Sequence, residues 1–132
     1  MVNDELKRMV LDYMEKGFLE NIVDMFKHDE NLYPLVIDMI KDERVRVRLG
    51  ATALVEELTR FKQKPLVDIV PELALLLRDP SPTVRGDSAN LLGIIRHENA
   101  LPFLMNAEND EDDNVRQIVR EALQDIRLPA GA

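Results

Sequence analysis

The stretch from Asp68 to Arg85, DIVPELALLLRDPSPTVR, carries a spaced signature that the chain repeats three times. The signature is Asn or Asp, two residues, Pro, seven residues, Asp, four residues, then Val-Arg. Its anchors are Asn31, Pro34, Asp42, Val47 and Arg48; Asp68, Pro71, Asp79, Val84 and Arg85; and Asn99, Pro102, Asp110, Val115 and Arg116. All five anchors move together, by 37 and then by 31 residues. This period predicts a solenoid, because one unit is too small to bury its apolar face alone.

Each copy of the signature predicts two helices joined by a tight turn. In the second copy, we expect Asp68 to cap the first helix and Pro71 to lie in its first turn. Ser81 is the expected N-cap of the second helix, with Pro82 at its first position. Apolar residues recur at offsets 0, 4, 7, 8 and 11 from each anchor Val, which is typical of one buried helix face. These predicted core residues are Val47, Ala51, Leu54, Val55 and Leu58; Val84, Ser88, Leu91, Leu92 and Ile95; and Val115, Val119, Ala122, Leu123 and Ile126.

The repeats divide the chain into segments of one expected domain, residues 1–132. Residues 1–30 lack the anchors but show helical periodicity on both sides of Gly17, so they predict a capping hairpin. The predicted segments are the hairpin 1–30, repeats 31–64, 65–98 and 99–127, and a tail 128–132. The first copy has six extra residues, which we expect in a loop over 60–65.

The composition restricts the possible functions. The chain has 132 residues, a net charge of −8 and no cysteine, which excludes disulfides, thiolate zinc sites and a cysteine nucleophile. The acidic balance opposes nonspecific nucleic-acid binding, which requires bases to neutralise phosphates. The longest apolar run is short compared with the roughly 20 residues of a membrane span. The first residues do not resemble a signal peptide. We therefore expect a cytoplasmic protein that binds neither nucleic acid nor membrane.

The segment Asp79–Gly93 resembles the HEAT-repeat family, in particular the PBS-lyase-like type. It is similar to the pattern D-x4-V-R-x2-A-A-x2-L-G, with Ser88 in a small-residue slot. The first and third copies depart from it, with Val55-Glu56 at the Leu-Gly positions and Val119-Arg120 where two small residues are usual. The resemblance covers about residues 31–127. It implies an all-α, right-handed superhelix of about four antiparallel helix pairs, with second helices lining the concave side.

The resemblance also implies a function. Members of the family mostly bind other proteins as scaffolds, and a minority are bilin lyases or a di-iron hydroxylase. Because the chain shows no catalytic constellation, we expect a non-catalytic scaffold without a cofactor. A lyase-like or metal-dependent enzyme subunit is the alternative. The repeating pairs Asp42 and Arg48, Asp79 and Arg85, and Asp110 and Arg116 resemble a structural ladder between repeats, since an Arg fork suits carboxylate and carbonyl acceptors.

Two clusters could suggest a metal site. His97-Glu98 is similar to a ligand pair of the hydroxylase, but it stands alone, and the other histidine, His28, lies 69 residues away. The acidic run Glu108–Asp113 lacks the glycine and the spacing of a calcium loop. Its position before a predicted helix favours a solvated turn, where acids stabilise the helix N-terminus. We predict no metal site.

The predicted partner surface lies on the second helices, at offsets 2, 6, 9 and 13 from the anchor Val, and extends to the basic loop. Its residues are Leu49, Ala53, Glu56, Arg60, Lys62 and Lys64; Gly86, Asn90, Gly93 and His97; and Gln117, Glu121 and Gln124. Leu49 and Ala53 are apolar where water favours polar residues, and the glycines leave room for a close approach. The bases Arg44, Arg46, Arg60, Lys62 and Lys64 could hold an acidic partner segment, although charged runs usually only solvate. A homodimer through the Met- and Phe-rich hairpin is a further possibility.

Overall fold

The computed structural model describes residues 2–128, so the predicted tail lies, except for Leu128, outside the described part of the chain. All regular structure in residues 2–128 is helical, which confirms the all-α prediction. The chain divides into two compact units, Met1–Leu66 and Val67–Ala132, and each is described by itself.

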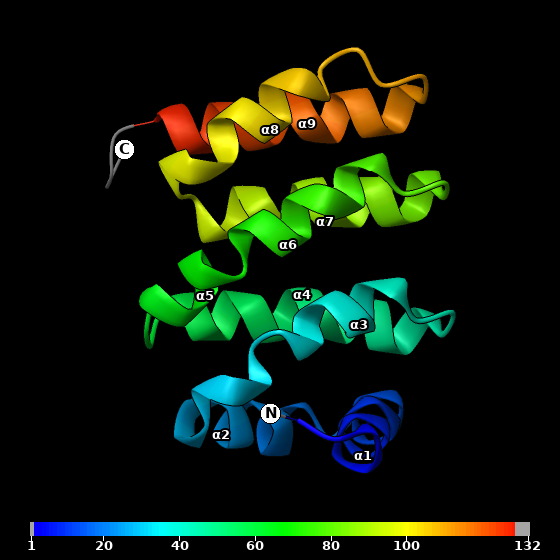
Figure 1. The fold of residues 1–132 in the computed structure, drawn as a ribbon, viewed down its shortest axis with the longest axis vertical. Helices are drawn as coiled ribbons and strands as arrows, with labels where there is room; N and C mark the ends of the chain where they lie inside the picture. The colour runs from blue at the N-terminus through cyan, green and yellow to red at the C-terminus, as the bar shows by residue number, and fades with distance from the viewer. Residues whose placement is uncertain (1, 129–132) are drawn as a thin grey trace. The chain divides into compact units, whose positions relative to one another are not determined.

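Unit 1 contains α1 (Asp4–Glu15), α2 (Leu19–His28), α3 (Leu35–Lys41) and α4 (Val45–Thr59) (Figure 1). The Asn3 side chain caps α1 by accepting from the Leu6 N–H at 2.8 Å. Gly17 joins α1 to α2 with φ at +87°, a conformation that glycine adopts without strain. α4 packs against α1, α2 and α3. The hairpin and the first repeat therefore share one core.

The core of unit 1 is centred on α4. All five predicted core residues of this helix, Val47, Ala51, Leu54, Val55 and Leu58, are fully buried. Phe26 and Tyr33 are also buried, with ring centroids 5.6 Å apart. Met14 lies directly against Gly50, because a Cβ at that position would overlap the Met14 sulfur. This contact brings the end of α1 close to the first half of α4.

Unit 2 contains α6 (Val70–Leu75) with a 3-10 turn (Leu76–Arg78), α7 (Pro82–Ile95), α8 (Leu101–Asn106) and α9 (Asp113–Arg127) (Figure 1). Ser81 caps α7, and Pro82 is its first residue, as predicted. Asp112 caps α9 by accepting from the Val115 N–H at 3.0 Å. Helix α6 packs on α7, and α8 packs on α9. The two second helices, α7 and α9, also pack on each other.

The structure corrects three sequence expectations. Asp68 does not cap the first helix of its repeat, because it ends a short additional helix, α5 (Lys64–Asp68), and Ile69 precedes α6. The extra residues of the first copy are thus partly helical instead of forming only a loop. Val84 and Ile126 are half-buried, while the other predicted core residues of α7 and α9 are buried.

Candidate protein-interaction surface

The recurring Asp and Arg anchors make the same contact in all three copies. In each, Nη1 of the anchor Arg donates to the main-chain carbonyl of the anchor Asp six residues earlier. These pairs are Arg48 with Asp42 at 2.9 Å, Arg85 with Asp79 at 2.9 Å and Arg116 with Asp110 at 2.6 Å. Each Asp side chain also accepts, at 2.9 Å, from the N–H two residues later. The anchors therefore fix the turn between the first and second helix of each repeat.

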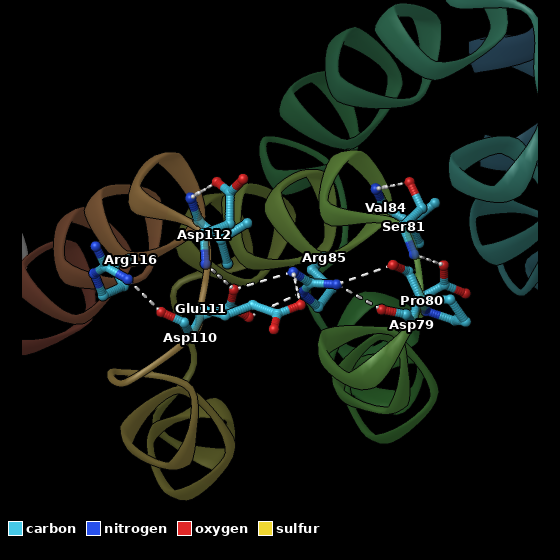
Figure 2. A network of polar contacts seen from close by, with 10 residues as sticks. Asp79, Pro80, Ser81, Val84, Arg85, Asp110, Glu111, Asp112 and Arg116 are labelled. Atoms are coloured by element: carbon cyan, nitrogen blue, oxygen red, sulfur yellow. Dashed lines mark hydrogen bonds and ion pairs between the residues drawn. The ribbon is translucent and has the colours of Figure 1, made fainter.

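Arg85 also joins two repeats inside unit 2 (Figure 2). Its Nε and Nη2 donate to the two carboxylate oxygens of Asp110, at 2.9 and 3.1 Å. Both side chains are only 8% exposed. Burial alone would raise the pKa of Asp110, but the bonds from Arg85 and the Asp112 N–H hold it below its usual value. The same bond to Asp110 raises the pKa of Arg85. This part of the predicted ladder is a buried, bidentate ion pair.

Unit 1 makes the corresponding link through a residue that the predicted ladder lacks. Arg44 donates to both oxygens of Asp42, at 2.9 and 3.0 Å, and its Nη1 reaches Asp12 of α1 at 2.9 Å. The bonds from Arg44 lower the pKa of Asp42. Arg44 was predicted only as a base of the possible partner-binding patch. Its position outside the repeated anchors gave no signal of this structural role.

Residues of both possible metal clusters make hydrogen bonds within turns of the chain. His97 caps a 3-10 turn, with its Nδ1 accepting from the Asn99 N–H at 3.1 Å. Nδ1 of His28 lies 2.8 Å from the carbonyl of Asp24. Among residues 2–128, no three His, Cys, Asp or Glu side chains are placed to hold a metal ion. In the acidic run, Asp110 and Asp112 bind the turn and the start of α9, which supports the reading of this run as a turn.

Most of the predicted basic patch is neutralised inside unit 1. Arg44 is held by two carboxylates, as described above. Arg60 pairs with Glu57 at 3.3 Å, and Lys62 pairs with Glu30 at 2.7 Å. Arg46 differs, because within the described chain it forms no ion pair and its side chain makes one hydrogen bond, of 3.4 Å, to the main-chain carbonyl of Glu15. The loop bases therefore do not form a uniformly cationic surface.

The predicted second-helix surface is exposed only in part. Leu49 of α4 is 66% exposed, whereas Ala53 is half-buried and Glu56 is exposed. In unit 2, His97 is half-buried, and the exposed predicted positions are Asn90, Gln117, Glu121 and Gln124. Gln117 donates to Glu121 at 3.2 Å, so the outer face of α9 is polar and bonded to itself. An exposed large apolar side chain is present at the predicted positions of α4 alone.

Gly86 and Gly93 do not belong to this surface, so their inclusion in it was wrong. Both are buried where α7 meets α9. A Cβ at Gly93 would lie 3.0 Å from the Cα and Cβ of Ala122, and one at Gly86 would lie 3.2 Å from Cδ1 of Ile118. The glycines do permit a close approach, but the approaching element is the neighbouring helix.

Sequence reasoning missed Val45, which is 57% exposed and lies one turn before Leu49. Val45, Leu49 and Ala53 follow each other at four-residue intervals along one side of α4, and we call them the α4 stripe. The equivalent positions are Pro82, Gly86 and Asn90 in α7, and Asp113, Gln117 and Glu121 in α9. Val45 stands two residues before the anchor Val, and the offsets considered began two residues after it.

The N-terminal hairpin uses much of its apolar surface internally. Met14 and Phe26 are buried, and Met9 and Met25 are half-buried. Phe18 is 47% exposed and packs edge-on against Tyr13, with ring centroids 5.7 Å apart. The area available for a homodimer is therefore smaller than the sequence suggested.

The repeated turn geometry agrees with a comparison against known families, in which the model for HEAT repeats matches residues 33–124. The chain belongs to the HEAT repeat family. The matched residues begin before α3 and end within α9, and they give the fold its class, an α–α solenoid. No curated protein matches the chain. None of the helices described in residues 2–128 is long and apolar enough to cross a membrane.

Proposed function

We propose that this HEAT repeat protein is a non-catalytic scaffold that binds a protein or peptide on the surface of its second helices. The observation that carries the proposal is the α4 stripe. Val45 and Leu49 are 57% and 66% exposed, one turn apart on the same side of a 15-residue helix. HEAT repeats commonly serve as protein-interaction scaffolds, which supports the same conclusion.

The stripe has the form that helix-mediated recognition uses. Apolar side chains at four-residue spacing can bury against one side of a partner helix or an extended segment. Burying such side chains contributes about 25 cal/mol per Å² of apolar surface removed from water. The stripe is short, and therefore fits a small interface in which a few anchors carry most of the affinity. In unit 2, the exposed second-helix residues Asn90, Gln117 and Glu121 are polar, so we assign no apolar anchor of the partner there.

The test compares two leucines of similar exposure on different helices. Leu49 of α4 is 66% exposed, and Leu75 of α6, a first helix, is 69% exposed. Tagged wild type, Leu49→Glu and Leu75→Glu are expressed in the native cell, and co-purified proteins are quantified by mass spectrometry. We expect Leu49→Glu to lose partners that Leu75→Glu retains. Equal retention by both variants, with unchanged circular dichroism and melting temperature, would argue against the α4 surface.

A homodimer through the hairpin would be a different use of unit 1. Light scattering over a dilution series separates the two uses, because a scaffold that binds other proteins through α4 needs no second copy. We expect the monomer mass of 15.2 kDa. A dimer that Phe18→Ser dissociates would assign the hairpin to self-association.

A further inference from the structure

Two cationic side chains border the α4 stripe on the side where α1 ends. Nη1 of Arg46 donates to the carbonyl of Glu15, the last residue of α1, and Lys16 follows immediately. Met14 lies against Gly50. The end of α1 therefore runs beside residues 46–50 of α4, so Arg46 and the chain at Lys16 lie near the half of the stripe that contains Val45 and Leu49.

Neither of these cations is neutralised. Within the part of the chain that the structure describes, Lys16 and Arg46 form no ion pair, and both are exposed. Some other bases of unit 1 have carboxylate partners, such as Lys7 with Asp38 and Lys62 with Glu30. Of the nearby acids, Asp12 binds Arg44 and one carboxylate oxygen of Glu15 is buried, while Glu43 is exposed just before α4.

The start of α4 lacks the side-chain cap that Ser81 and Asp112 provide at the starts of α7 and α9. The partial positive charge at the N-terminus of α4 also has no acid within the first turn, and the nearest acids of the same segment, Asp42 and Glu43, precede the helix. The other end of the stripe carries the exposed Glu56. An exposed cation, Arg46, thus lies at the start of the stripe, and an exposed acid, Glu56, lies towards its end.

We infer that the α4 stripe takes an acidic amphipathic segment of a partner protein, an inference that rests on the proposed function. Apolar side chains of the segment, spaced by one helical turn, cover Val45 and Leu49. Its carboxylates face Lys16 and Arg46, where they meet unpaired charge. A basic segment would meet repulsion at the same place, and such repulsion between like charges selects against wrong partners. The apolar contact contributes most of the affinity, and the two cations determine the specificity for acidic segments.

The test selects ligands without presupposing their charge. A displayed library of random 16-residue peptides is selected on the wild-type protein and counter-selected on Leu49→Glu. We expect the peptides that depend on Leu49 to be rich in Asp and Glu, with apolar residues four positions apart. Enriched peptides that depend on Leu49 but are neutral or basic overturn the inference and leave the proposed function standing. If no peptide depends on Leu49, both fail.

A charge-reversal pair checks the assigned cations. The double variant Lys16→Glu plus Arg46→Glu should weaken binding of a selected acidic peptide by about tenfold at low salt, with less difference at high salt where exposed charges are screened. The matched control is Arg78→Glu plus Arg120→Glu, which changes the net charge equally at exposed cations of unit 2. Equal weakening by both double variants would show a general charge effect and contradict the assignment to Lys16 and Arg46.

Discussion

Arg85 connects two repeats with one planar side chain. Its fork binds the Asp110 carboxylate, and its Nη1 binds the Asp79 carbonyl, while the whole side chain is 8% exposed. Arg85→Ala would leave the carboxylate buried without its cation, which typically costs about 3–5 kcal/mol. Arg116, whose side chain is 30% exposed, is the internal comparison. We expect urea unfolding to show a clearly larger loss for Arg85→Ala than for Arg116→Ala, with Arg85→Lys between them. Equal losses of unfolding free energy for Arg85→Ala and Arg116→Ala would mean that the bidentate pair with Asp110 adds no stability.

The same ion pair predicts a pH dependence of stability. The pKa of Asp110 is lower in the folded protein than its usual value, so the unfolded chain takes up a proton first as the pH falls. The stabilisation is fully present above the unfolded pKa of about 4 and is lost as the pH falls through the folded pKa. The difference in unfolding free energy between wild type and Asp110→Asn should therefore be largest near neutral pH and shrink below about pH 4. A constant difference down to pH 2 would contradict this assignment.

For individual residues, the sequence predicted the structural role of the anchors that recur in each repeat, and it missed the role of Arg44, which does not recur. Asp and Arg stood at one spacing in three copies, so a structural role followed from repetition. Arg44 carries the equivalent link in unit 1, but no repeated spacing marked it. Its role depends on how close the start of α4 lies to Asp12 of α1, and only the folded structure of unit 1 determines this distance.

The α7–α9 contact depends on the absence of a side chain at Gly93. A methyl group there would lie 3.0 Å from the backbone of Ala122, and the two helices would have to separate. Overpacked cores cost about 1–3 kcal/mol, and the higher helix propensity of alanine offsets about 1 kcal/mol, so we expect Gly93→Ala to destabilise the protein by up to about 2 kcal/mol. Thermal unfolding followed by circular dichroism measures this effect.

Gly86→Ala is the matched control within α7. Its added methyl group would meet the end of the flexible Ile118 side chain at 3.2 Å. Alanine also favours a helix interior over glycine by about 1 kcal/mol, so the net change should be small or stabilising. If Gly86→Ala were as damaging as Gly93→Ala, the backbone contact at Ala122 would not be the cause.

The errors at the scale of elements have a common origin. Periodicity identified which face of each second helix is apolar, and it predicted the start of α7 at Ser81 and Pro82 correctly. It could not tell how closely α9 approaches α7, so Gly86 and Gly93 were placed on the surface. It also could not tell that the last of the extra residues, Lys64 and Pro65, begin the short helix α5. Both outcomes depend on contacts between distant segments rather than on local patterns.

For the molecule as a whole, the fold class followed from the sequence more completely than the candidate site did. The spaced signature marks residues that form the turns and the buried helix faces, and these residues recur because every repeat packs in the same way. A binding surface need not repeat, and here the exposed apolar pair Val45 and Leu49 occurs on α4 and not at the equivalent positions of α7 and α9. The signal of the stripe was therefore its difference from the other repeats.

A partner that binds along α4 would protect this helix from amide hydrogen exchange, which can be measured with and without a co-purified partner. We expect slower exchange on binding at the start of α4 and the end of α1, with α3 and α8 unchanged. Slower exchange confined to the first helices, or no change anywhere in α4, would contradict it.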